Sequence, residues 1–170
     1  MQTRLARTIG RVTAAVTVAA AAATVPAGVA AAAPATDPGP SACSPGQQRG
    51  TIEALPSTSE VANYTLTVMA EPGTSPCYLS GPPANMVFSL NGSPRAVDVA
   101  PTPEDGNAVQ FGDGMPVTYD LHVPASDGPA QANQVTFNPG TPAGELPGDF
   151  TAYGPIGVDA GMTVGPAKPF

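Results

Sequence analysis

The residues best suited to chemistry in this 170-residue chain are two cysteines, Cys43 and Cys77, and one histidine, His122. A nucleophilic cysteine or serine needs a base within reach, and one imidazole is present for that role. The serine of the common hydrolase architecture lies in a G-x-S-x-G pentapeptide, which the chain lacks; the stretch GTSP around Ser75 does not fit. His122 also falls out of phase with its apolar neighbours, so we expect a solvated surface side chain. We therefore predict no catalytic residues, and a small secreted hydrolase with His122 as its base is the alternative.

The same residue types limit the metal sites that the chain can build. A copper site of the cupredoxin type needs more than one histidine, and zinc sites lack ligands for the same reason. Calcium needs only oxygen ligands, and such residues gather around the turns PEDGN and FGDGM: Glu104, Asp105, Asn107 and Asp113. Neither turn fits an EF-hand loop. We interpret them as hydrated acidic turns and expect no cofactor, with a calcium-stabilised adhesion or matrix module as an alternative.

The first 35 residues predict a secretory signal peptide. Three arginines precede the apolar run VTAAVTVAAAAATV, and no acidic residue occurs before residue 37. The run is too short to span a bilayer comfortably, and cleavage after Ala31 or Ala35 fits the small-x-small rule. We expect residues 1–35 to be removed, residues 36–48 to form a Pro/Gly-rich linker and residues 49–170 to form one domain. The product would be secreted or associated with the cell envelope, without stable membrane insertion.

The charge of the chain after the leader excludes several partners. All thirteen acidic residues lie after residue 36, whereas only Arg49, Arg95 and Lys168 are basic there, which gives a net charge of −10 at neutral pH. A domain with this charge repels phosphate backbones and anionic lipid headgroups. We therefore expect neither nucleic-acid binding nor binding to a membrane surface.

Beyond the linker, apolar and polar residues alternate with a period of two, as in half-buried strands. The clearest runs are residues 61–70 and 117–123, and residues 85–90 form a third. Asn91-Gly92 then supplies the positive-φ pair that a tight type I′ hairpin requires, before a return strand at 95–100. Weaker strands are predicted at 50–55, 107–111, 134–137 and 162–164.

About seven short strands with frequent Pro-Gly and Asp-Gly turns, and no helical periodicity after the leader, predict an all-β domain. We expect an immunoglobulin-like antiparallel β-sandwich, and a partly open barrel is the structural alternative.

Two cysteines in an exported chain predict one disulfide, because such a chain meets an oxidising compartment. A bond between Cys43 and Cys77 closes a loop of about 35 residues and restricts the unfolded chain by about 4 kcal/mol. It would hold the proline-rich N-terminal segment beside the loop that follows residues 61–70.

The stretch YTLTVMAEPGTSPCYLSGPPANMVFSLNG resembles a signature of secreted actinobacterial proteins of the family "domain of unknown function 4232". Its most specific part is C-x-L-x-G-x-P, here Cys77, Leu79, Gly81 and Pro83. The chain departs from the family at Pro82, where an aromatic is usual, and it lacks the second cysteine pair of many members. The resemblance implies an exported β-sandwich of unknown activity and supplies no catalytic residues. We expect a monomeric, non-catalytic module that binds an unknown cell-envelope or extracellular component.

Overall fold

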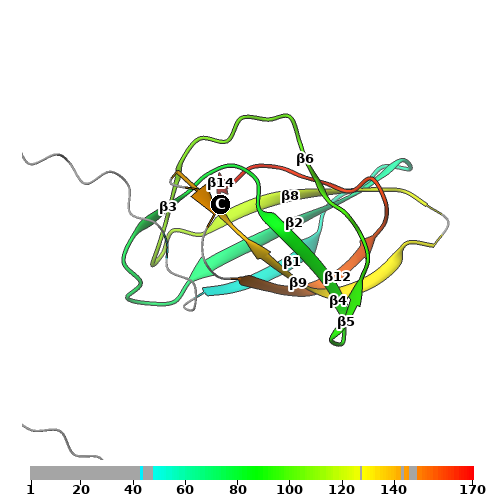
Figure 1. Ribbon diagram of the computed structural model, residues 1–170, viewed down its shortest axis with the longest axis horizontal. Helices are drawn as coiled ribbons and strands as arrows, with labels where there is room; N and C mark the ends of the chain where they lie inside the picture. The colour runs from blue at the N-terminus through cyan, green and yellow to red at the C-terminus, as the bar shows by residue number, and fades with distance from the viewer. Residues whose placement is uncertain (1–42, 44–47, 127, 143, 146–148) are drawn as a thin grey trace, which may run out of the picture. The chain divides into compact units, whose positions relative to one another are not determined.

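The structure, a computed structural model, describes Cys43 and residues 48–126, 128–142, 144–145 and 149–170. The predicted signal peptide and nearly all of the predicted linker lie outside these residues. All described residues fall in one compact unit, Asp37–Phe170. Their regular structure consists of strands alone (Figure 1), which confirms the all-β class. Within this described part, no helix is long and apolar enough to cross a membrane.

Most of the strands belong to one mixed sheet with the order β5-β4-β9-β12-β1-β2-β8-β13-β6, and β14 also pairs with β8. Pairing is parallel between β1 and β12 and between β13 and β6, and antiparallel elsewhere. The bounds are β1 (Gln48–Ala54), β2 (Val61–Ala70), β4 (Ala84–Leu90), β5 (Ser93–Arg95), β6 (Ala100–Pro101), β8 (Val117–Pro124), β9 (Ala130–Asn138), β12 (Phe150–Val158), β13 (Thr163–Val164) and β14 (Lys168–Pro169).

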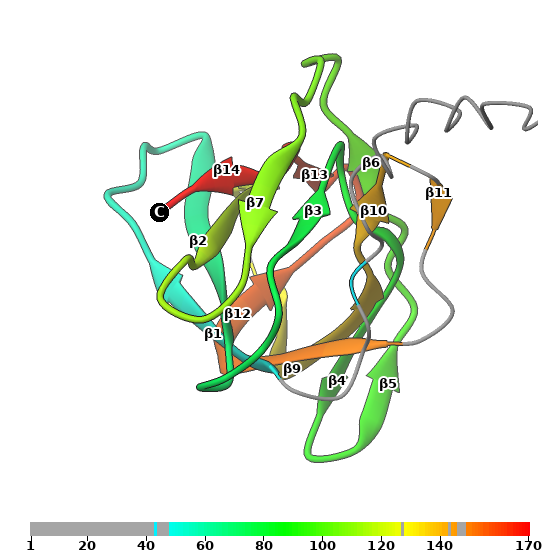
Figure 2. The same cartoon turned by 90° about the vertical axis from the view of Figure 1, so that its left-hand side faces the viewer.

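Two small sheets accompany the main one. Strand β3 (Cys77–Leu79) pairs with β7 (Val109–Phe111), and β10 (Gly140–Thr141) pairs with β11 (Gly144–Glu145). Figure 2 shows β3 and β7 side by side. The ring of Phe111 packs against Phe150 of β12 at a centroid distance of 5.9 Å, so this small sheet covers part of the core.

The main sheet curls until its inner faces meet. Strands β8 and β9 are separated by β12, β1 and β2 in the sheet order, yet the rings of Tyr119 in β8 and Phe137 in β9 touch edge to face at 5.8 Å. Phe137 in turn lies 6.0 Å from Phe150. The two halves of the sheet therefore share one core, and the aromatic rings lie at its centre.

The alternation predicted for residues 117–123 is confirmed. Residues 61–70 form the predicted strand, but Thr67, predicted on its polar face, is buried together with Leu66 and Val68. Val117, Tyr119, Leu121 and Val123 are buried, and the residues between them are only half-buried. Burial of each such Val or Leu side chain contributes about 1.5–3 kcal/mol. All of β8 pairs with β2, from Val61↔Pro124 to Val68↔Val117, so their apolar residues share one face.

The hairpin at Asn91-Gly92 is also confirmed, since their φ angles are 51° and 82°. The predicted return strand at 95–100 is wrong in its bounds, however. Strand β5 spans Ser93–Arg95, and residues 96–99 are not strand. The Val97 N–H donates to the Arg95 carbonyl at 3.0 Å, which turns the chain away from β4.

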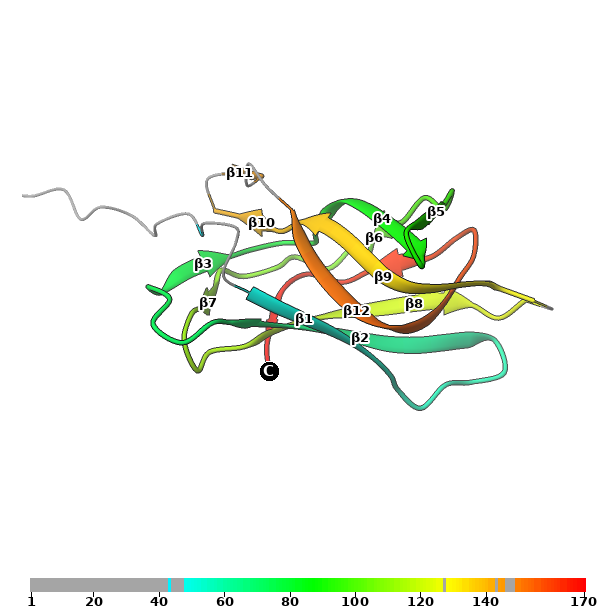
Figure 3. The same cartoon turned by 90° about the horizontal axis from the view of Figure 1, so that it is seen from below.

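Strand β12 was not predicted from the sequence, although it is central in the sheet. Figure 3 shows β12 beside β1. Glycines allow the two strands to approach closely, because a Cβ atom at Gly50 would lie 2.6 Å from the Cβ of Ala152. A Cβ atom at Gly154 would likewise collide with the Ile52 carbonyl. Pro155 occurs at a bulge, where the register with β9 shifts between Tyr153 and Ile156.

The predicted disulfide is present. Cys43 and Cys77 are bonded, with 5.0 Å between their Cα atoms, and both side chains are buried in the core. The bond ties a residue that precedes β1 to the first residue of β3.

Candidate functional site

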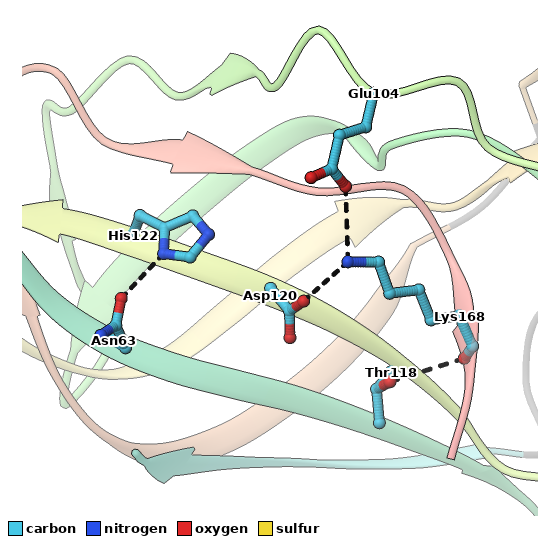
Figure 4. A network of polar contacts seen from close by, with 6 residues as sticks. All are labelled: Asn63, Glu104, Thr118, Asp120, His122 and Lys168. Carbon is cyan, nitrogen blue, oxygen red and sulfur yellow. Dashed lines mark hydrogen bonds and ion pairs between the residues drawn. The ribbon is translucent and has the colours of Figure 1, made fainter. Parts of the chain in front are cut away.

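Glu104, one of the predicted calcium ligands, is engaged by a lysine. The Lys168 ammonium lies 3.4 Å from Glu104 and 2.9 Å from Asp120 (Figure 4), and Thr118 donates to the Lys168 carbonyl at 3.5 Å. The hydrogen bond to Asp120, reinforced by the charges of Asp120 and Glu104, raises the pKa of Lys168 above its ordinary value. These contacts fasten β14 to β8 and to the loop that contains Glu104.

The other predicted calcium ligands lie apart from this pair. Asp113 accepts a hydrogen bond from the Gly73 N–H at 2.9 Å, which joins the turn after β7 to the turn after β2. Asp105 and Asn107 are exposed. In the described part of the chain, no three His, Cys, Asp or Glu side chains are grouped so that they could hold a metal ion.

His122 is half-buried, whereas the sequence predicted a solvated side chain. Its register partner on β2 is Asn63, whose Oδ1 lies 2.8 Å from the imidazole Nδ1. The Asn63 Nδ2 donates to the Pro56 carbonyl at 3.0 Å, so its Oδ1 must accept and Nδ1 must carry the proton. The hydrogen-bond partner of the ring is therefore an amide and not a nucleophile.

A different group of residues forms an open surface on the outer face of β1, β2 and β12. The register pairs Arg49 with Met69, and Thr51 with both Thr67 and Tyr153, so these side chains point to the same side of the sheet. We call Arg49, Thr51, Met69, Thr151 and Tyr153 the outer face, and leave out Thr67 because it is buried.

A groove of about 520 Å³ runs along the outer face between β1 and β12. Its lining includes Arg49, Thr51, Thr151 and Tyr153, and Gly50 lies between them without a side chain. A smaller hollow of about 350 Å³ is lined by Arg49, Met69 and Glu71, among others. Arg49 therefore lines both depressions of this surface.

The large side chains of the outer face are well exposed. Tyr153 is 61% exposed and Met69 is 42% exposed, and the Arg49 side chain is 80% exposed. Arg49 lies 3.5 Å from Glu71, and such an exposed ion pair contributes little to stability. An exposed aromatic ring, a guanidinium and a thioether on a rigid sheet are the side chains that dominate protein contacts.

The sequence prediction missed Tyr153 as a member of a site because it missed β12. The sequence analysis did place Met69 on the polar face of its strand. A large apolar residue at a position expected to be polar was a signal in the sequence for an exposed contact surface.

Comparisons with protein-family models, curated proteins and solved structures found no match for this chain.

Proposed function

We propose that this chain is an exported, non-catalytic binding module with an immunoglobulin-like β-sandwich fold. The strand order supports this fold: β5-β4-β9-β12 follows the order of strands C′, C, F and G, and β1-β2-β8 follows A, B and E. Strand β6 takes the place of D, with β13 inserted between it and β8. The disulfide differs from the usual one between strands B and F, because it joins Cys43 to β3.

Export through the predicted signal peptide is part of the same proposal. A disulfide that buries both sulfurs in the core is compatible with an oxidising compartment outside the cytoplasm. The resemblance of residues 64–92 to the family "domain of unknown function 4232" agrees with this location. The module would be secreted or held at the cell envelope, as a monomer.

The outer face is the contact surface in this proposal, and one observation carries it. The exposed ring of Tyr153 and the exposed guanidinium of Arg49 both line one groove on a rigid sheet. A Tyr or Arg that acts as a hot spot at the centre of an interface contributes about 2 kcal/mol or more, which is about thirtyfold or more in affinity. The partner would be an envelope or extracellular protein, because the acidic domain disfavours nucleic acid and anionic lipid.

Site-specific photocrosslinking in the source cells tests this function. A photoreactive phenylalanine analogue replaces Tyr153 in one strain and Ala100, an exposed residue of β6, in a matched strain. We expect a discrete adduct from position 153 only, and its loss when Arg49→Glu is added. No adduct from position 153, or the same adducts from both positions, would contradict the proposal.

A further inference from the structure

A second cleft lies at the other end of the strand order, beside β4. It has a volume of about 550 Å³, and its walls are the first residues of β4 and the segment that follows β5. The lining combines apolar side chains, among them Pro82, Pro83, Met86, Val97 and Val99, with a similar area of polar surface. Asp98 also contributes to this lining and is exposed.

The cleft follows an open strand edge. The ladder between β4 and β5 covers only Leu90↔Ser93 to Phe88↔Arg95. The residues of β4 that precede this ladder, Ala84 to Val87, have no register partner in β5. Residues 96–99 are not strand, and the Val97 N–H donates to the Arg95 carbonyl. Among the described residues, no strand pairs with Met86 on the β5 side of β4.

The edge is held in place before any ligand arrives. A bulge interrupts the β4–β9 register between Ala84 and Val87, where Asn85 has a φ of 51°. The Asn85 side chain donates to Asn138 of β9 at 2.8 Å and fixes this bulge. A rigid edge loses little conformational entropy on binding, which favours affinity.

The charge of the cleft selects its occupant. Asp98 is acidic, and the residues after the leader carry three basic against thirteen acidic side chains. Arg95, the nearest cation in sequence, donates through Nε to the Gln131 carbonyl of β9 at 3.0 Å and is thereby directed toward β9. The ligand expected here is an extended peptide in which apolar and basic residues alternate. Its apolar residues would contact the apolar side chains of the cleft, and its basic residues would match the negative charge of Asp98 and of the domain.

We propose that the cleft beside β4 binds an extended basic–apolar peptide segment of another protein, which adds to the edge at Met86 as a short strand. Backbone hydrogen bonds to β4 would supply affinity, and Val97, Val99 and Asp98 would select alternating side chains. The open edge spans about three residues, or about 10 Å, so the bound segment is short. This site is separate from the outer face and does not depend on its function.

The test uses the peptide acetyl-Val-Lys-Val-Lys-Val-amide and ¹H–¹⁵N spectra of the labelled domain. We expect saturable shifts at Met86, Val97 and Val99. Two further peptides are N-methylated, one on its valines and the other on its lysines. In an extended peptide the N–H groups of alternate residues point to opposite edges, so each peptide loses the hydrogen-bond donors of one edge. Strand addition predicts that one of them loses at least tenfold in affinity while the other binds normally, because only one edge of the peptide faces β4.

Charge and location are tested in parallel. The glutamate analogue acetyl-Val-Glu-Val-Glu-Val-amide should bind at least tenfold more weakly, and Asp98→Lys, a change at an exposed residue, should reverse that preference. Tyr153→Ala should leave peptide binding unchanged, which separates this site from the outer face. No binding at millimolar peptide, equal affinity of the two N-methylated peptides, or shifts confined to Thr51 and Tyr153 would each overturn the proposal.

Discussion

Two tyrosines on the inner face of the sheet differ in what their hydroxyl groups contact. The Tyr64 hydroxyl accepts a hydrogen bond from the Gly157 N–H at 3.1 Å, across 93 residues of sequence. The Tyr119 hydroxyl is fully buried and has no hydrogen-bond partner among the described residues. A buried hydroxyl without a partner costs about 1–3 kcal/mol. Removal of the hydroxyl should therefore change the free energy of unfolding in opposite directions at the two tyrosines.

We expect Tyr119→Phe to raise the free energy of unfolding by about 1 kcal/mol and Tyr64→Phe to lower it by about the same amount. The first substitution removes an unsatisfied hydroxyl, whereas the second leaves the Gly157 N–H without its acceptor. Urea unfolding of both variants against the wild type measures the difference. A loss of stability in Tyr119→Phe equal to that in Tyr64→Phe would contradict this assignment.

Tyr119 also sets a limit on alkaline stability. Burial raises the pKa of its phenol above the ordinary value near 10, so the folded state keeps a proton that the unfolded state releases. Stability is therefore complete below pH 10 and falls above it by about 1.4 kcal/mol per pH unit. The raised pKa of Lys168 acts in the same direction and over the same range. Unfolding measured from pH 8 to pH 11.5 should show this fall, and Tyr119→Phe should have the shallower slope.

At the scale of the strands, the pairing of β1 with β12 depends on Gly50. A methyl group there would meet the Cβ of Ala152 and the carbonyl oxygen of Thr151, each at 2.6 Å. We expect Gly50→Ala to lower the free energy of unfolding by about 3 kcal/mol, because the two strands must move apart. Gly165→Ala is the matched control, since its nearest heavy atom would lie at 3.7 Å, an ordinary contact. Similar unfolding midpoints for the two variants would show that β1 and β12 are not held this closely.

The same strand explains how far the sequence could predict the fold. Residues 117–123 alternate without interruption, residues 61–70 do so apart from Val61 and Met69, and Asn91-Gly92 specifies its turn, so these two strands and this hairpin were predicted correctly. Strand β12 keeps the two-residue period too, through Phe150, Ala152, Ile156 and Val158. Gly154 and Pro155 resemble a turn in sequence, and only the pairing of β12 with β1 and β9 shows them to be a bulge within a strand.

The candidate site follows from that missed strand. The sequence directed attention to His122 and to the acidic turns, because those residue types carry chemistry. Tyr153 and Arg49 are 104 positions apart and line the same groove only because β1 pairs in parallel with β12. A non-local parallel pairing leaves no short-range signal, so the outer face could not be assembled from the sequence.

For the whole molecule, the disulfide should account for much of the stability. It closes a loop with a sequence separation of 34, and the chain-entropy model assigns about 4 kcal/mol to such a loop. We expect the double variant Cys43→Ser, Cys77→Ser to lose about that amount, as reduction of the wild type should. Chemical denaturation with and without reductant provides the measurement, and a change below about 1 kcal/mol would contradict the expectation.

The net charge of −10 that residues 36–170 carry predicts a dependence on salt. Self-repulsion destabilises a compact acidic domain, and screening relieves it, so we expect the melting temperature to rise with added NaCl. Calcium should add nothing specific, because Glu104 pairs with Lys168 and Asp113 with the Gly73 N–H. Melting with CaCl₂ and MgCl₂ at matched ionic strength tests this, and a larger rise with calcium would indicate a real site.

The neighbours of β1 also constrain the order in which the fold can form. Its N-terminal half pairs on one side with β2, which follows closely, but on the other side with Ala152 and Tyr153, about a hundred positions later. A ribosome or a translocation channel delivers the chain from its first residue to its last, so one side of β1 stays exposed until nearly all of the polypeptide has emerged. Closure of the sheet is therefore a late, high-contact-order event, and folding should take milliseconds to seconds rather than microseconds.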